Sequence, residues 1–378
     1  MFYKNKISLK FSMVYFTIFL VIGINAPFWP LWLSSKGFDS RYISLIISLS
    51  VLMKIISNPF FAGLGDKYGN RKIPMLYLSI VASIILFTLS FINYQFLIGV
   101  LAIIAWAFFA PLMPITESLT TTAANKYGFD YGRTRLWGSV SFVLMAFLGG
   151  ILVENYGLQI IPYIMSVGTF LVFISIYLTP TVYSLPSTHK IKITTLLRNR
   201  SFLPFLLACG AIQASHGMYY TFATIHWKNI GLSETMIGGL WAEGVLFEIV
   251  LLAYFYKIRS YFSFKSLLIF AALTATIRWI ITAYATEPLI LVFIQSLHSI
   301  TFGLTHISAI YFISEVMPER AQAKSQALYS AISMGIIMSL AIAISGDLYD
   351  AYQEKAFIFS ALLALSGAII TLYINKAN

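Results

Sequence analysis

Long apolar runs separated by short polar segments fill the chain from end to end. Most runs have about 20 residues, the length that an α-helix needs to cross the hydrocarbon core of a bilayer. Strands in lipid would have to close into a barrel, and these runs are too long and too evenly apolar for barrel strands. The pattern therefore predicts an all-α membrane protein with twelve transmembrane helices, at residues 11–33, 42–63, 73–92, 96–121, 136–154, 158–178, 202–226, 235–256, 264–284, 288–314, 322–345 and 353–374.

Basic residues are divided unequally between alternate loops. With the N-terminus in the cytoplasm, two of the 25 Lys and Arg residues fall within spans, Lys54 and Arg278. Nineteen others lie on the cytoplasmic side, and the four on the outer side are Lys36, Arg41, Lys228 and Lys355. An excess of Lys and Arg marks cytoplasmic loops, so both termini are predicted to be cytoplasmic.

Composition supports lipid as the main solvent. Hydrophobic residues make up 59% of the chain and charged residues only 10%, whereas soluble domains are about one quarter charged. The net charge of +11 is interpreted as cytoplasmic loop charge, not as a nucleic-acid site, because no basic cluster is interleaved with aromatic residues. The single cysteine, Cys209, excludes an intrachain disulfide.

The chain is predicted to have two similar halves. The longest segment between helices, 179–201, contains prolines and basic residues and is interpreted as a cytoplasmic linker. A weak repeat supports this division, because a short Gly-containing loop leads into the second helix of each half, at 37–39 and 231–233. The predicted domains are an N-terminal six-helix bundle at 1–178 and a C-terminal six-helix bundle at 202–378.

The loop after the second predicted helix contains Asp66, Lys67, Gly69 and Arg71. It resembles the cytoplasmic loop of the major facilitator superfamily between its second and third helices. Gly69 would permit a tight turn, and Asp66 could hold a helix end or a basic partner as a breakable gating latch. The alternative is a charged turn that only sets topology.

Five further segments resemble the phenylpropionate permease branch of that superfamily, which is related to the lactose permease and the nucleoside–proton symporters. They lie at 130–139, 213–216, 240–245, 295–303 and 323–329. The resemblance implies two six-helix bundles, alternating access, and proton-coupled uptake of a small organic solute such as an aromatic acid, a sugar or a nucleoside. It also implies a monomer in the bacterial inner membrane, with membrane lipid, protons and solute as partners and with no cofactor, metal or nucleic acid.

Ionisable residues inside spans are expected to have functions, because each costs roughly 2.5–3.5 kcal/mol at the bilayer centre. Glu117 and Arg135 lie on neighbouring helices of the first half, which could bring them together. The resemblance to the lactose permease suggests that this pair binds substrate. The alternative is an ion pair that only anchors two helices.

Glu248, Arg278 and His306 lie on three successive helices of the second half. They resemble the acid, arginine and histidine that couple protons in the lactose permease. A proton carrier must be a carboxyl that stays protonated while water is excluded and that releases its proton when a cation approaches. Glu248 is the first candidate, and Glu243, which departs from the family pattern, is the second.

Histidines and aromatic residues of the second half complete the predicted solute site. His298, Phe302 and His306 share one broad face of the tenth helix, and His216 and Tyr220 lie on the seventh. Trp241, on the eighth, could stack on an aromatic solute. The alternatives are buried histidines that bond across helices and aromatic residues that only pack.

Other classes of function are less well supported. Hydrolase, phosphate-binding and zinc-protease motifs are absent from the sequence, and its loops are too short for a soluble catalytic domain. A channel or sensor would not need two halves with buried acids. Proton-coupled efflux by antiport is the main rival among carriers.

Overall fold

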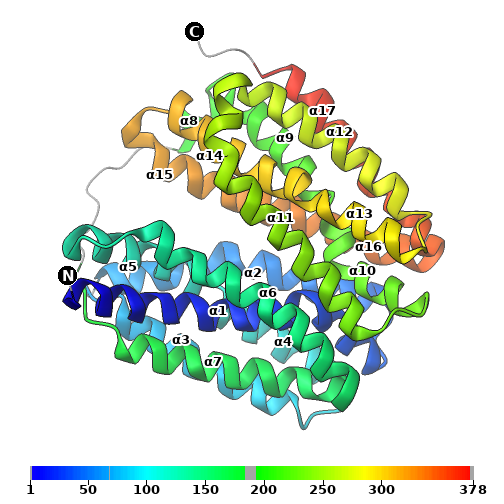
Figure 1. The fold of residues 1–378 in the computed structure, drawn as a ribbon, viewed down its shortest axis with the longest axis horizontal. Helices are drawn as coiled ribbons and strands as arrows, with labels where there is room; N and C mark the ends of the chain where they lie inside the picture. The colour runs from blue at the N-terminus through cyan, green and yellow to red at the C-terminus, as the bar shows by residue number, and fades with distance from the viewer. Residues whose placement is uncertain (1, 68, 184–192, 375–378) are drawn as a thin grey trace. The chain divides into compact units, whose positions relative to one another are not determined.

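The protein is described by a computed structural model that covers residues 2–67, 69–183 and 193–374, without the side chains of residues 2–4, 66 and 193. Nearly all of the described residues are helical (Figure 1). Part of the predicted linker 179–201, residues 184–192, lies outside the described residues. In chain order the elements are α1 (Phe2–Ser35), α2 (Ser40–Lys67), α3 (Lys72–Leu89), α4 (Gln95–Phe109), α5 (Leu112–Tyr127), α6 (Tyr131–Tyr156), η1 (Leu158–Ile160), α7 (Ile161–Leu178), α8 (Ile193–Leu197), α9 (Phe202–Ala214), α10 (Gly217–Asn229), α11 (Glu234–Tyr261), α12 (Phe264–Thr282), α13 (Pro288–Ser296), η2 (Ser299–Leu304), α14 (Thr305–Val316), α15 (Glu319–Leu328), η3 (Tyr329–Ile337), α16 (Met338–Tyr352), η4 (Gln353–Ala356) and α17 (Phe357–Leu372).

Within the described residues, 10 helical stretches are long and apolar enough to cross a membrane. The predicted span 322–345 and nearly all of the predicted span 353–374 fall in one continuous stretch, Glu319–Leu372. The predicted span 202–226 is divided into α9 and α10, which have 13 residues each. The apolar runs therefore predict helices correctly, while several interruptions within them are set by the fold.

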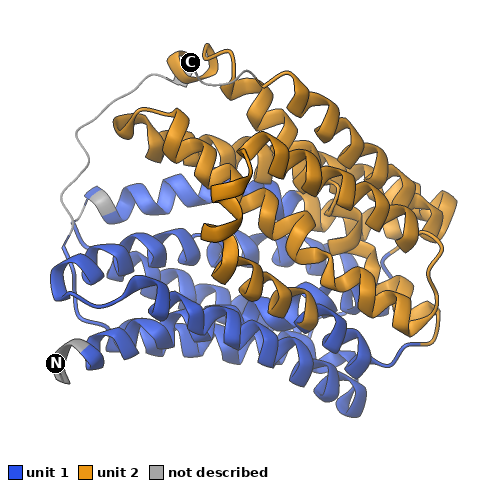
Figure 2. Cartoon of the chain, turned by 45° about the horizontal axis from the view of Figure 1, so that its top comes forward, with its two compact units in different colours: residues 1–38, 49–187, 232–242 blue, residues 39–48, 188–231, 243–378 orange. Residues whose placement is uncertain are grey.

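The chain divides into two compact units, which Figure 2 shows in different colours. Unit 1 comprises residues 1–38, 49–187 and 232–242, and unit 2 comprises residues 39–48, 188–231 and 243–378. Two long helices, α2 and α11, contribute residues to both units. Each unit thus contains the first turns of a helix whose remainder belongs to the other.

In unit 1, α1 packs along α6 and α7, and α7 also packs along α3. Close approach depends on small residues. A Cβ atom at Gly23 of α1 would lie 2.9 Å from the carbonyl oxygen of Phe142, and one at Gly149 of α6 would lie 2.5 Å from the Ile24 side chain. Glycines at such contacts let helix backbones approach closely, and this close packing helps to hold helices together in lipid, where no hydrophobic force drives them to associate.

The first turns of α11 join unit 1 through a similar contact. A Cβ at Gly238 would collide with the carbonyl oxygen of Ala146 on α6. Glu154 of α6 also accepts a 3.0 Å hydrogen bond from the backbone N–H of Thr235. The carboxylate satisfies a free N–H group at the start of α11, where negative charge is favoured.

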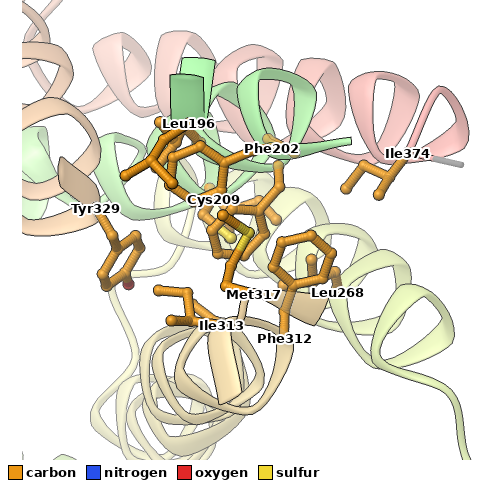
Figure 3. Close-up of a cluster of buried hydrophobic side chains, with 14 of the residues drawn as sticks. Leu196, Phe202, Cys209, Leu268, Phe312, Ile313, Met317, Tyr329 and Ile374 are labelled. Atoms are coloured by element: carbon orange, nitrogen blue, oxygen red, sulfur yellow. The ribbon is translucent and has the colours of Figure 1, made fainter. Parts of the chain in front are cut away.

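Unit 2 has a buried apolar core, part of which Figure 3 shows. Phe205 of α9 stacks on Phe312 of α14 with ring centroids 4.1 Å apart, and Cys209 lies in the same cluster. α17 packs against α9 and α12. The first turns of α2 also belong to this unit, where Arg41 pairs with Asp347 at 3.0 Å and Ser48 donates to the carbonyl of Ser339. The core holds α9, α12 and α14 in place around the polar groups of this unit.

Candidate functional site

An ion pair links α5 and α6 in unit 1. The Arg135 Nε atom donates to Oε1 of Glu117 at 2.9 Å, and each side chain is 30% exposed. Tyr15 of α1 donates to the other carboxylate oxygen, Oε2, at 3.0 Å, and Tyr131 also donates to Oε2. Glu117 therefore accepts three hydrogen bonds, and the charge of Arg135 is neutralised within the protein.

The connection between α5 and α6 fixes this ion pair. Gly128 ends α5 with a φ of 71°, a left-handed conformation that a residue with a side chain adopts at a cost. Asp130 then caps α6 by accepting a hydrogen bond from the backbone N–H of Arg133. The two helices are joined by a tight turn, so Glu117 and Arg135 meet across it.

Aromatic rings cover the Arg135 guanidinium, whose carbon lies 4.5 Å from the ring centroid of Phe19 and 5.4 Å from that of Tyr15. A Cβ at Gly138 would lie 3.1 Å from Arg135 Nη1, so this glycine leaves room for the guanidinium. The arrangement is rigid, with the cation held by a carboxylate and by two rings. Either predicted role, substrate binding or helix anchoring, is compatible with it.

Unit 2 contains a second polar cluster where the helices are interrupted. The regular α-helical hydrogen bonding is interrupted at Ser215 and His216, between α9 and α10, although both residues keep right-handed helical dihedrals. The Ser215 hydroxyl accepts a 2.8 Å hydrogen bond from the Trp279 indole, and His216 Nδ1 contacts the carbonyls of Ile212 and Gln213. Because carbonyls only accept, Nδ1 carries the proton of the neutral ring and Nε2 is the acceptor.

The π-helix η2 is the second interruption. It follows His298 and carries Thr301 and Phe302. The wider π geometry displaces side chains relative to an α-helix, and such segments are frequent at functional sites. Thr301 Oγ1 lies 3.0 Å from Nε2 of His216, so the two interrupted helices meet through this hydrogen bond.

Arg278 of α12 lies at the centre of this cluster and is fully buried. Its Nη1 atom donates to Thr301 at 2.9 Å and faces Nδ1 of His298 at 3.3 Å. Its Nη2 atom donates to Gln295 at 3.0 Å. Its guanidinium carbon lies 4.5 Å from the Trp279 ring centroid and 5.0 Å from that of Tyr219.

The Arg278 Nε atom has no hydrogen-bond partner. Among the described residues, no carboxylate forms an ion pair with this arginine. All the polar groups that it contacts are neutral hydroxyl, amide and imidazole groups.

Aromatic and imidazole rings line one side of the cluster. The rings of His298 and Phe302 stack with centroids 5.3 Å apart, and Phe302 stacks in turn on His306 at 6.2 Å. Tyr220 stacks on His216 at 6.0 Å. His216, Tyr220, His298 and Phe302, which were predicted to line a solute site, therefore lie together within unit 2. Tyr220 and Phe302 are its partly exposed members.

The predicted proton-coupling residues Glu248, Arg278, His306 and Glu243 lie against different neighbours. Glu248 of α11 packs against η2, since a Cβ at Gly303 would lie 3.0 Å from its Cγ atom. His306 contacts the hydroxyl of Tyr329 at 3.3 Å, whereas the histidine beside Arg278 is His298. Glu243 is half-buried one and a half turns before Glu248 on the same helix.

The remaining predicted residues lie elsewhere. Gly69 has a φ of 63°, the conformation expected for a tight turn, and Arg71 donates to Ser118 of α5. Lys67 is exposed, and the side chain of Asp66 lies outside the described residues, so its predicted latch stays a prediction. Trp241 is buried but belongs to unit 1, unlike the histidines of the second cluster.

Several residues of the two clusters were not predicted as site residues. Tyr15 and Tyr131 complete the surroundings of Glu117, and Tyr131 precedes Arg135 by four residues, which is a usable signal. In unit 2 the unpredicted members are Ser215, Trp279, Thr301 and Gly303. Thr301 follows His298 by three residues, a helical spacing that could have identified it.

Comparisons with known proteins place this architecture among membrane transporters of the major facilitator superfamily. The chain belongs to the MFS_1-like family, whose model matches residues 8–361. It is 30% identical to a probable 3-phenylpropionic acid transporter of Escherichia coli (strain K12), over 93% of each chain. It is 25% identical to a maltose permease of Geobacillus stearothermophilus, over 97% of this chain and 94% of that protein.

A crystal structure of a mutant of the nucleoside transporter NupG has the same fold. Its TM-score is 0.87, with 14% identity and with coverage of 98% of this chain and all of the other. These relatives are transporters and permeases, not enzymes. The chain is therefore a multi-pass membrane transporter.

Proposed function

We propose that this transporter takes up a small organic solute together with protons, by alternating access. It would have twelve transmembrane helices in two six-helix halves, 1–178 and 202–378, joined by the linker 179–201. Both termini would face the cytoplasm of a bacterium, with the protein a monomer in the inner membrane. The distribution of Lys and Arg supports this orientation, and the bacterial relatives support this location.

The observation that carries proton coupling is the position of Glu248. This acid lies within a helix of spanning length and packs against Gly303 of the π-helix η2, the residue that follows Phe302. An ionisable residue inside a membrane span costs several kcal/mol. Its presence in such a helix therefore indicates a function. Glu248 would carry the proton, with Glu243 as the second candidate and with Arg278 and His306 promoting release.

The solute would be held by polar and aromatic groups from both halves. Glu117 and Arg135 would contribute from the first half, and His216, Tyr220, Trp241, His298 and Phe302 from the second. The relatives are a transporter of an aromatic acid and a permease for a sugar, and the similar solved structure is of a nucleoside transporter. The solute class is accordingly an aromatic acid, a sugar or a nucleoside.

The external pH of de-energised, lightly buffered cells tests this proposal. The cells express the protein and receive phenylpropionate, sugars and nucleosides in turn. Symport predicts alkalinisation with one solute, because protons enter with it. The Glu248→Gln variant should lose accumulation against a gradient and keep exchange of labelled solute. The matched control is Glu287→Gln, since Glu287 is exposed at the start of α13 and its side chain makes no capping bond.

Two outcomes would contradict the proposal. Loss of both accumulation and exchange in a normally folded Glu248→Gln variant would make Glu248 a binding or structural residue. Acidification on solute addition, or protection against cationic drugs without uptake of any solute, would indicate efflux by antiport.

A further inference from the structure

Lys54 lies in the interior of the long helix α2, in the part of this helix that belongs to unit 1. It stands near the middle of the apolar stretch Ser40–Gly65 and is partly buried. The nearer end of this stretch is about 16 Å away along the helix axis, because each residue advances the helix by about 1.5 Å. A lysine side chain is too short to bring its ammonium group to that end.

The ammonium group of Lys54 has neither a hydrogen-bond acceptor nor a counter-ion among the described residues. The ion pairs in that part of the chain involve other residues, and no charged side chain acts on it. The ring of Trp106 on α4 faces it, with the ring centroid 5.9 Å from Nζ. By contrast, Lys72 and Lys265, at the starts of helices, each donate to two carbonyl oxygens. Lys54 is thus a membrane-embedded cation that the described protein groups do not compensate.

Two polar neighbours lie on the same face of α2. Ser57 and Asn58 follow Lys54 by three and four residues, the spacing that makes side chains neighbours on a helix surface. The Ser57 hydroxyl and the Oδ1 atom of Asn58 are buried without a hydrogen-bond partner, and Ser57 is only 5% exposed. Pro59 has no N–H, so the carbonyl of Ile55 loses its usual helical donor. Acceptors for a proton donor therefore lie within about one turn of Lys54 in an apolar span.

Lysine differs from arginine because it can give up its proton, whereas arginine stays protonated in proteins. An ammonium group without compensation is costly in a dry span, and a buried group of this kind tends to become neutral instead. Lys54 can therefore have two states inside the membrane. It is charged when water or a solute supplies acceptors, and it is neutral when neither is present.

We propose that Lys54 is a second proton-carrying residue, whose proton moves inward with the solute and must leave before the empty transporter returns. This inference rests on the proposed proton symport and adds a site in unit 1 to Glu248. Nζ would take up a proton from the outer side. Acceptor oxygens of the bound solute, with those of Ser57 and Asn58, would then compensate the ammonium charge. After the solute leaves, Nζ would release its proton to the cytoplasm, and the neutral amine would permit the return.

Two substitutions test this role because they fix the charge of the side chain in opposite states. Lys54→Arg keeps a positive charge that cannot be released, so it should block the return of the empty transporter. Its net uptake should fall at least about tenfold, while exchange of labelled solute stays within about threefold of the unchanged protein. Lys54→Met removes the proton site but permits the return, so net uptake should continue with one proton fewer per solute.

Both variants are measured as the full-length protein in proteoliposomes that contain a pH-sensitive dye. Labelled 3-phenylpropionate, maltose and uridine are the solutes, and protein-free vesicles give the background. The proton count per solute is the ratio of the initial rates of proton entry and label entry. The matched controls are Lys355→Arg and Lys355→Met, since Lys355 is exposed in η4 and should behave as the unchanged protein.

Two results would overturn the inference. One is net uptake by Lys54→Arg at the rate of the unchanged protein, and the other is an unchanged proton count in Lys54→Met. If Lys54→Arg loses exchange as well, the proton count of Lys54→Met decides alone. Absence of proton movement with every solute in the unchanged protein would remove the symport proposal and this inference together. Normal coupling in both variants would remove this inference alone.

Discussion

Two arginines in the helices of this transporter are stabilised in opposite ways. In unit 1, Arg135 meets the carboxylate of Glu117 at 2.9 Å, and Tyr15 and Tyr131 donate to the same carboxylate. In unit 2, Arg278 is more deeply buried, and the groups that it contacts are neutral. The carboxylate of Glu117 neutralises the cation of the first cluster, whereas the hydrogen-bond partners of Arg278 in the second are uncharged groups.

The comparison shows why burial of a charge does not identify its role. An ion pair with satisfied hydrogen bonds can anchor two helices with no ligand present. A cation surrounded only by neutral donors and acceptors lacks that compensation. The counter-ion, and not the depth of burial, therefore separates the two sites.

The largest expected effect comes from removing the carboxylate that pairs with Arg135 in unit 1. Glu117→Ala would leave Arg135 and the hydroxyls of Tyr15 and Tyr131 without their acceptor. We expect a loss of about 2 kcal/mol in the free energy of unfolding, below the value for a fully buried pair because both side chains are 30% exposed. Denaturant unfolding in detergent measures it. The double variant Glu117→Ala/Arg135→Ala should recover part of the loss, and no recovery would show that the pair is not the cause.

A second substitution would create in unit 2 the kind of arginine–carboxylate pair that unit 1 contains. Gln295→Glu places a carboxylate beside Nη2 of Arg278, where an internal ion pair would compete with an acidic ligand. We expect the affinity for 3-phenylpropionate to fall about tenfold, or about 1.4 kcal/mol, with the affinity for an uncharged sugar less affected. Calorimetry with both ligands measures the change.

A matched control for that substitution is Gln326→Glu, since Gln326 is exposed on α15. It should leave the affinity for both ligands unchanged. If Gln295→Glu bound the acid as tightly as the unchanged protein, Arg278 would not be the group that recognises it.

The smallest expected effect concerns the rings that hold Arg278. Trp279→Phe removes the hydrogen bond from the indole to Ser215 but keeps an aromatic face under the guanidinium. We expect a loss of about 1 kcal/mol in stability, with a small change in acid binding. Thermal unfolding with and without 3-phenylpropionate measures both quantities. An unchanged melting temperature would indicate that Ser215 finds another partner.

The pattern of apolar runs was sufficient to predict an all-helical membrane protein, because the length needed to cross lipid leaves few alternatives. Motif spacing also identified the family and selected Glu117, Arg135, His216, His298 and Phe302 for attention. The charged and imidazole residues among them were recognisable because such groups are costly in apolar helices. Their roles in solute binding stay predictions.

The surroundings of each charge were decided only by the tertiary structure. The break at Ser215–His216 and the π geometry of η2 depend on contacts between α9, α12 and η2, which local sequence does not encode. The neighbours of Arg278 come from α10, α12, α13 and η2. Spacing along the chain could therefore not show which residues surround this arginine. Sequence determined which residues are costly to bury, and packing determined which of them are compensated within the protein.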